Sequence, residues 1–564
     1  MMTTGSPSPR VSAIGVVAEK NEQGIVGEFF ELFKTPWEFA SSEKSYDILL
    51  ITADTDDKID APVVILYGSG KRKTDERCGI QPAKGRSAVV LRWQDKDVPI
   101  YGEASALGPS GETVVEIQGT HEAAGLRIGD QGRFIYRFGF DLFREVEHLL
   151  RSGQPVNHAS IPTLDIHIEL LRDCILSAGV SFVEITPFPP QHRFIACLTH
   201  DVDFVGIRRH RFDPTMFGFI YRALFGSLIR AMRGFLKWKK LLANWKAVIS
   251  LPGIYLGIQK DVMIQFDRYA DLEQDLPSTF FLIPYKNRPG LELEGRTAKG
   301  RAVKYDIGDI APEVQKLLAR GCEIGLHGID AWHSAERGND ERLQVSRMIA
   351  RPDMGVRMHW LFFSEESPDV LEQAGFSYDS TAGYNDAVGY KSGTSQAFRL
   401  PGTTLYELPL HIMDTALLSP SRMALSEAAA FERVKEICSH ASANGGALTI
   451  NWHHRSVGPE RFWDDLYINL LGEMKKNGAW FATARDAVSW FDKRRSVVFQ
   501  RVDRRGGEMH IQLSCPSGDE TPGLVLRVHA PSPKHSASFV SGVGRGGKDQ
   551  PVYGDLDTVV PIHL

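Results

Sequence analysis

The sequence is poor in cysteine, and its six cysteines are scattered along the chain without a C-x-x-C pair. This spacing excludes a disulfide-rich scaffold and argues against a cysteine-based zinc site. The chain also lacks an apolar run of the ~18 residues that a membrane-spanning helix needs. Its first ten residues, MMTTGSPSPR, lack the basic and apolar regions of a secretory signal. We therefore expect a cytoplasmic protein.

Neither sign of charge dominates, because 65 Lys and Arg oppose 70 Asp and Glu and the net charge is -5. This balance excludes a globally basic protein that binds nucleic acid. Hydrophobic residues make up 43% of the chain, which is enough for sizeable cores. At roughly 100–200 residues per domain, the 564 residues predict about two to four domains.

Composition and periodicity divide the chain into a disordered N-terminus (1–20), an α/β domain (21–185), a (β/α) barrel (192–495) and a small β-rich appendage (496–564). The proline-rich stretch TPFPPQ separates the α/β domain from the barrel. The appendage has strand-like runs, EMHIQLS and GLVLRVHA, and a glycine-rich segment at 542–547 that we expect to be flexible.

Short apolar strands alternate with helices across the third segment, in about seven repeats, which predicts a mainly parallel sheet or a barrel. The expected strands that precede polar residues are 194–199, 278–284, 322–327, 355–360, 406–414 and 447–454. We favour a distorted (β/α) barrel, because in barrels the C-terminal ends of the strands converge on one site.

Residues 208–250 interrupt this rhythm with ten Lys or Arg and a single acid, Asp213. Helical spacing places cations on one face: Arg222, Arg230, Arg233, Lys237 and Lys240. It places apolar residues on another: Phe217, Ile220, Leu224, Leu228, Phe235, Trp238 and Leu242. A basic amphipathic helix of this kind can lie on an anionic membrane surface. The alternative is a helical cap that packs on the barrel and leaves its basic face in water.

The motif LTHDVD places two carboxylates at the end of the first barrel strand, Asp201 and Asp203. In an extended chain these positions point to the same side. Two close carboxylates repel each other unless a cation or a proton lies between them. The motif therefore suggests a metal ligand beside a general base, although a solvated loop with a helix-capping Asp is the alternative.

The motif GLHGIDAWHS follows a later strand and contains His327, Asp330 and His333. Imidazole nitrogens and a carboxylate suit zinc or a similar divalent ion. Together with Asp203 they predict a three-ligand site that leaves one position open for water. Hydrogen-bonded histidines without a metal are the alternative.

Two further strand ends carry polar side chains. GVRMHW places Arg357 and His359 at one of them, where Arg357 can orient a pocket carboxylate or form a structural salt bridge. TINWHHRS places His453 and His454 at the other, where a histidine beside a metal is a candidate general acid. Trp452 would form an apolar wall of the pocket or belong to the core.

Seven motifs resemble, in order and spacing, the polysaccharide deacetylases of the NodB-homology type, also known as the carbohydrate esterase family 4-like proteins. They are LTHDVD, STFFLIP, EIGLH, GVRMHW, AGFSYDST, YELPLHIMD and LTINWHH, and they lie within 192–495. The resemblance implies a distorted (β/α) barrel, a divalent metal that is usually zinc, and removal of acetyl groups from N-acetylated sugars. Relatives cleave other non-peptide amides.

The resemblance also implies roles. Asp201 matches the catalytic base, Asp203 and His327 match metal ligands, and Arg357 matches the arginine that orients the base. His453 or His454 matches the late catalytic histidine, and we favour His453, which directly follows Trp452.

One departure concerns the third ligand. The family spaces its metal histidines four apart, but Ala331 occupies that position here. Asp330 or His333 must then complete the site, and the sequence does not choose between them.

The expected activity is metal-dependent hydrolysis of an N-acetylated saccharide, with Trp452 and His454 beside the substrate. A cytoplasmic location favours a biosynthetic substrate, lipid-linked or nucleotide-linked, at the inner face of the membrane if the 208–250 helix binds lipid. Nucleic acid is not an expected partner. The alternatives are an amidohydrolase acting on a non-sugar amide and an inactive, carbohydrate-binding barrel.

Overall fold

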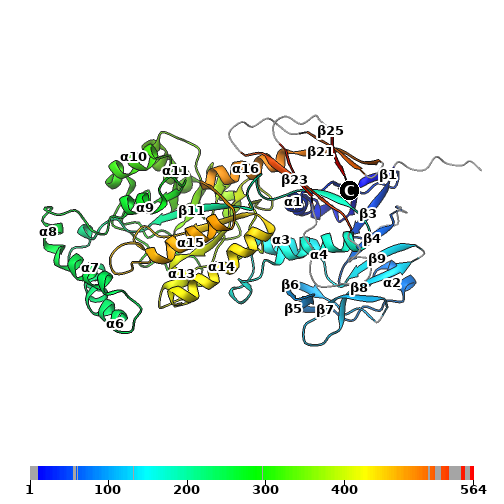
Figure 1. Ribbon diagram of the computed structural model, residues 1–564, viewed down its shortest axis with the longest axis horizontal. Coiled ribbons are helices and arrows are strands. Elements are labelled where there is room, and N and C mark those ends of the chain that lie inside the picture. The colour runs from blue at the N-terminus through cyan, green and yellow to red at the C-terminus, as the bar shows by residue number, and fades with distance from the viewer. Residues whose placement is uncertain are drawn as a thin grey trace, which may run out of the picture. The chain divides into compact units, whose positions relative to one another are not determined.

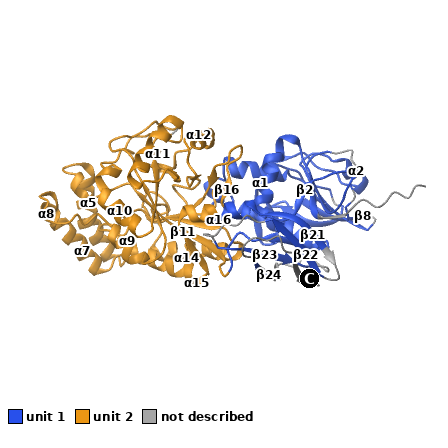
Figure 2. Cartoon of the chain, turned by 90° about the horizontal axis from the view of Figure 1, so that it is seen from above, with its two compact units in different colours: residues 1–190, 392–394, 490–564 blue, residues 191–391, 395–489 orange. Residues whose placement is uncertain are grey.

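The computed structural model describes residues 10–54, 59, 61–108, 110–130, 132–294, 296–505, 508–514, 522–531, 548–552 and 559–563. The start of the expected disordered N-terminus (1–9) and the glycine-rich segment at 542–547 lie outside these residues. The chain forms two compact units (Figure 2). Unit 1 comprises 1–190, 392–394 and 490–564, and unit 2 comprises 191–391 and 395–489. The division after residue 190 falls within the proline-rich stretch.

Unit 1 is built on a nine-stranded mixed sheet in the order β2-β1-β3-β4-β9-β8-β7-β5-β6. Strands β1, β2, β3, β4 and β9 pair in parallel, and the remaining pairs are antiparallel. The strands are β1 (Arg10–Val17), β2 (Trp37–Phe39), β3 (Ser45–Ile51), β4 (Val63–Tyr67), β5 (Arg86–Trp93), β6 (Lys96–Ala104), β7 (Glu112–Ile117), β8 (Ala123–Asp130) and β9 (Arg133–Phe138).

The helices of this unit are α1 (Gln23–Phe33), α2 (Lys73–Cys78), α3 (Leu142–Arg151) and α4 (Thr163–Ser177). Helix α3 begins where the Asp141 side chain accepts a hydrogen bond from the backbone N–H of Arg144. Its apolar positions are buried, and it packs against α1, α4 and β6.

Two expectations for unit 1 need correction. Residues 10–17, expected to be disordered, form β1, because parallel pairing with β2 and β3 satisfies their backbone hydrogen bonds. Residues 496–564, expected to form a separate appendage, belong to this unit. Strands β23 (Leu524–His529) and β24 (Lys548–Val552) extend β10 (Phe182–Ile185) into a three-stranded sheet. A second three-stranded sheet contains β21 (Val498–Arg505), β22 (Glu508–Ser514) and β25 (Val559–His563).

Unit 2 contains a mainly parallel sheet in the order β16-β17-β15-β14-β13-β12-β11-β19-β18, with β20 also paired to β11. The strands are β11 (Phe194–Val202), β12 (Thr279–Leu282), β13 (Glu323–Gly328), β14 (Val356–Met358), β15 (Tyr378–Asp379), β16 (Phe398–Arg399), β17 (Tyr406–Glu407), β18 (Leu410–Met413), β19 (Ala447–Asn451) and β20 (Ala479–Ala482). The sheet curls strongly, because β17 near one end and β18 at the other are separated by only two residues of chain. The predicted α/β class with a distorted (β/α) barrel is confirmed.

Helices cover this sheet, and Figure 1 shows β11 between α10 and α11 on one side and α13, α14 and α15 on the other. The helices of this unit are α9 (Phe266–Glu273), α10 (Ala311–Ala319), α11 (Ala335–Ile349), α12 (Ser367–Gln373), α13 (Asp414–Leu418), α14 (Glu427–Asn444) and α15 (Asp464–Lys476). Helix α16 (Ala484–Ser496) contains the boundary between the units, after residue 489. One predicted strand, 406–414, is in fact two, β17 and β18. Pro409 lies at the break and has no N–H for a sheet hydrogen bond.

The segment after β11 forms a helical arm, defined here as residues 207–258. It contains α5 (Pro214–Tyr221), the π-helical turn η4 (Arg222–Gly226), α6 (Ser227–Met232), α7 (Trp238–Ile249) and α8 (Leu251–Tyr255). Among the residues that the structure describes, no helix combines the length and the hydropathy required to cross a membrane.

Candidate metal centre

Strand β11 carries the first two site residues to the centre of the sheet. All nine of its residues are buried. Side chains alternate along the strand, so Thr199 and Asp201 point to one side while His200 points to the other. The imidazole of His200 lies 2.8 Å from a carboxylate oxygen of Glu273 and 2.8 Å from the Trp452 carbonyl oxygen. Asp203 follows the strand, and its side chain is 31% exposed, so solvent can reach it.

Three side chains form a cluster that can hold a metal ion: Asp203, His327 and His359. One donor atom from each lies within 4.8 Å of the other two. Oδ1 of Asp203 lies 3.0 Å from Nε2 of His327 and 3.5 Å from Nε2 of His359. The two imidazole rings lie 4.9 Å apart. One carboxylate and two imidazoles form a typical donor set for zinc and similar divalent ions.

The register of β13 and β14 explains why His359 joins this cluster. These parallel strands are neighbours, and His327 pairs with Arg357 across them. The ends of both strands therefore lie at the same edge of the sheet, and His359 follows β14 directly. The backbone carbonyl of Arg357 lies 2.9 Å from Nδ1 of His327. Because a carbonyl only accepts, Nδ1 carries the proton and Nε2 is directed toward Asp203, as in metal-binding histidines.

Asp330 and His333, expected to supply the third ligand, interact elsewhere. The carboxylate of Asp330 accepts hydrogen bonds from the backbone N–H of Leu291 and from Arg337, each 2.8 Å long. Its other neighbour is His333, whose Nε2 lies 3.1 Å from Oδ1 of Asp330. The two candidates thus pair with each other at the start of α11, and His359 takes the place that the sequence analysis gave them.

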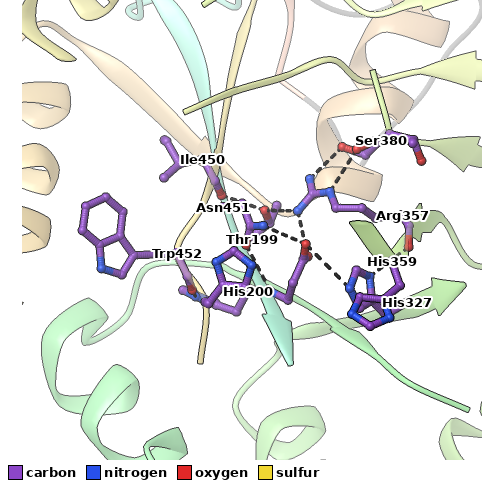
Figure 3. A network of polar contacts seen from close by, with 12 residues as sticks. Thr199, His200, His327, Arg357, His359, Ser380, Ile450, Asn451 and Trp452 are labelled. Carbon is purple, nitrogen blue, oxygen red and sulfur yellow. Dashed lines mark hydrogen bonds and ion pairs between the residues drawn. The ribbon is translucent and has the colours of Figure 1, made fainter. Parts of the chain in front are cut away.

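Asp201 lies beside the cluster in a buried hydrogen-bond network. Its Oδ1 accepts a hydrogen bond from Arg357 at 3.0 Å, and its Oδ2 accepts one from Asn451 at 2.7 Å. Oδ2 also lies 3.9 Å from Nε2 of His327. The guanidinium of Arg357 is fixed by Thr199 and Ser380, as Figure 3 shows. The structure therefore holds the Asp201 carboxylate in one orientation, next to the metal-binding atoms.

His453 approaches the other carboxylate oxygen of Asp203. Its Nε2 is 3.5 Å from Oδ2 of Asp203, and its Nδ1 is 2.6 Å from Oδ1 of the buried Asp414. Burial opposes the charged imidazole, but the neighbouring Asp414 carboxylate outweighs it and raises the pKa of His453 above its usual value. The Asp414 carboxylate stabilises the charged imidazole, which is the form that a general acid needs.

The electrostatics of the cluster fit a bound cation. Burial lowers the pKa of His359 to about 3, so its imidazole is neutral, which is the form that binds metal. Burial alone would raise the pKa of Asp203, but the surrounding imidazoles outweigh it and the net pKa lies below its usual range. Oδ1 of Asp203 is also a buried acceptor without a hydrogen-bond donor of good geometry. An ionised carboxylate with an unsatisfied oxygen, facing two histidine nitrogens, suits a divalent ion.

Trp452 and His454, expected beside the substrate, belong to the core instead. Trp452 is fully buried and packs on Tyr467. Nε2 of His454 accepts a hydrogen bond from the backbone N–H of Gln265, and its Nδ1 lies 3.1 Å from the carbonyl oxygen of Phe204. Burial lowers the pKa of His454 to about 3. Both ring nitrogens of His454 are thus occupied, and neither residue is available to a substrate.

Sequence reasoning noted His359 at its strand end but gave it no role, and it missed Asn451 and Asp414. His359 and Asn451 follow or end strands that precede recognised site residues, whereas Asp414 follows β18, from which no site residue was proposed. The signal that could have found them is their position at the same edge of the sheet.

No protein-family model matches the sequence, and no curated protein does. Solved structures show distant similarity. A protein from Mycobacterium smegmatis assigned to the polysaccharide deacetylases is 15% identical, with a TM-score of 0.33 over 57% of this chain and 99% of that chain. The PuuE allantoinase is 13% identical, with a TM-score of 0.33 over 54% and 92% of the two chains. A protein from Pseudomonas aeruginosa PAO1, also assigned to the polysaccharide deacetylases, is 17% identical, with a TM-score of 0.30 over 41% and 73%.

Proposed function

We propose that this protein is a metal-dependent hydrolase that removes the acetyl group from an N-acetylated saccharide. The observation that carries the proposal is the arrangement around Asp203. A three-donor metal cluster lies beside a fixed carboxylate, Asp201, and beside a histidine that the Asp414 carboxylate holds, His453. Amide hydrolysis needs these three functions together, because water is a weak nucleophile and an amine is a poor leaving group.

Asp203, His327 and His359 would hold the metal, and zinc is the ion that their chemistry favours. When bound, the metal would lower the pKa of a water molecule and polarise the amide carbonyl. Asp201 takes a proton from the attacking water, and its ion pair with Arg357 keeps the carboxylate pointed at the reacting atoms. The water oxygen forms a bond to the carbonyl carbon.

His453 then donates a proton from Nε2 to the amide nitrogen as the carbon–nitrogen bond breaks. Asp414 holds Nδ1 and stabilises the charged imidazole before this transfer. The products are acetate and a free amine. The restriction to a saccharide rests on the resemblance of the sequence motifs, whereas the hydrolytic chemistry rests on the site.

The test is acetate release from N-acetylglucosamine oligosaccharides by the purified full chain, with and without zinc. We expect turnover that a chelator abolishes and zinc restores. Asp201→Asn should bind the metal yet lose two to four decades of activity, which is the scale of general-base catalysis. Hydrolysis of cyclic or linear non-sugar amides alone would contradict the saccharide assignment and leave the hydrolase in place. Metal binding without hydrolysis of any amide would contradict both.

A further inference from the structure

The helical arm exposes an unusual amount of apolar surface. Thirteen of the twenty large apolar side chains that the described residues expose lie between residues 212 and 258. The arm is nevertheless folded around its own buried cluster, which includes Phe219, Ala247 and Ile254. This cluster also contains Phe204, the residue after Asp203, so the base of the arm lies next to a metal-binding residue in the chain. The exposed side chains are therefore a surface of a packed element.

These side chains form two stripes with helical spacing. The first runs along α5, η4 and α6 and consists of Phe217, Tyr221, Phe225, Ile229 and Met232. Steps of three and four residues place them on one face of the continuous helical segment.

The second stripe runs along α7 and consists of Trp238, Leu242, Trp245 and Ile249. Helix α7 packs against η4, and Nε1 of Trp245 lies 3.4 Å from the carbonyl oxygen of Leu224. The second stripe therefore adjoins the first. Exposure in the two stripes ranges from 36% for Trp245 to 78% for Ile249.

Three of the five cations expected on the basic face form ion pairs with acids that follow β19, although Arg222 and Lys237 stay exposed. Arg222 pairs with Glu460 at 3.1 Å, Lys237 with Asp465 at 2.8 Å and Lys240 with Asp464 at 2.6 Å. In the helical cap considered from the sequence the apolar face packs on the barrel, but four of the seven residues of that face are exposed: Phe217, Phe235, Trp238 and Leu242. The ion pairs hold the arm with its apolar stripes outward.

Three other cations are exposed next to the stripes: Arg233 after Met232, Lys239 after Trp238, and Lys246 after Trp245. No carboxylate among the described residues pairs with them, and residues 214–260 contain no Asp or Glu. A face that combines aromatic and aliphatic side chains with unpaired cations is complementary to anionic phospholipid. The same cations would repel each other across an interface between two copies of the chain.

We propose that the helical arm docks the protein onto the surface of an anionic phospholipid membrane. The two stripes enter the boundary between headgroups and acyl chains, and Arg233, Lys239 and Lys246 contact the lipid phosphates. Docking brings the metal centre close to the membrane, because the arm is rooted at Phe204.

The test is co-sedimentation of the full chain with phosphatidylcholine vesicles that contain or lack phosphatidylglycerol, without metal or substrate. This readout does not depend on the hydrolase proposal. We expect binding to the anionic vesicles. R233Q/K239Q/K246Q should weaken binding by up to about a hundredfold, at roughly fivefold per cation.

The apolar contribution is tested with F225S/W238S/L242S, which should weaken binding at least tenfold. The matched control, V156S/L343S/I468S, removes three exposed apolar side chains elsewhere and should bind like the unmodified chain. The proposal would be overturned if F225S/W238S/L242S and V156S/L343S/I468S lost vesicle binding equally, or if the unmodified chain did not bind the vesicles. Dimerisation that F225S/W238S/L242S abolishes, without vesicle binding, would overturn it in favour of a second copy.

Discussion

Exchanging the polar groups of Asp201 and Asn451 separates the structural role of Asp201 from its catalytic role. In the unmodified chain, Nδ2 of Asn451 donates a hydrogen bond of 2.7 Å to Oδ2 of Asp201. In Asp201→Asn, an amide NH2 group takes the place of that oxygen. Two donors then oppose each other in a buried site, which costs about 1–3 kcal/mol. The buried Arg357 also loses its carboxylate partner, which costs about 3–5 kcal/mol for a pair of this kind.

The double variant D201N/N451D restores the match of donor and acceptor and keeps one negative charge in the pocket. Urea unfolding should show that it regains about 1–3 kcal/mol over D201N. Acetate release should remain two to four decades below that of the unmodified chain in both variants, because no carboxylate remains at position 201. Recovery of activity together with stability would show that Asp201 acts only on the structure and would refute its role as the base.

Three further predictions concern other buried groups. Asp414→Asn should lower acetate release by two to four decades with unchanged metal content, since His453 loses the carboxylate that holds its proton; unchanged turnover would contradict this role. Burial raises the pKa of Glu145 to about 7, so the unfolded chain ionises first and stability should fall by up to about 3 kcal/mol as pH rises from about 4.5 to about 7. Thermal unfolding of Glu145→Gln should lack this slope, and an equal slope in both proteins would contradict the assignment. Asp75→Ala should destabilise unit 1 by about 3–5 kcal/mol in urea unfolding, because Arg137 is fully buried, whereas Glu76→Ala on the same helix should have no measurable effect.

The parts of the site that follow one strand were predictable from the sequence. Asp201 and Asp203 share a side because strand positions two apart face the same way, and their neighbours on β11 confirm that alternation. Arg357 was expected to orient Asp201, and the two form an ion pair of 3.0 Å.

The third metal donor was not predictable by the same reasoning. Spacing within the motif after His327 pointed to Asp330 or His333, whereas the register of β13 and β14 places His359 in the cluster. Such a contact depends on the register of two neighbouring strands, and the spacing of residues within one motif does not reveal that register.

The arm shows the same limit. Its helical period revealed an apolar face and a basic face. That period does not show that three of the cations pair with acidic residues more than two hundred positions later in the chain, Glu460, Asp464 and Asp465.

The central claim is that Asp203, His327 and His359 hold one divalent ion. It is tested most directly by zinc content after dialysis of the full chain, His359→Ala and His333→Ala, measured by elemental analysis. His359 lies next to Asp203 and His333 lies next to Asp330. Each variant removes one histidine that faces a carboxylate, so each serves as the control for the other. We predict about one zinc per chain in the unmodified protein and in His333→Ala. His359→Ala should retain clearly less than one zinc per chain, because loss of a ligand weakens binding at least tenfold. Full zinc content in His359→Ala together with its loss in His333→Ala would contradict the account.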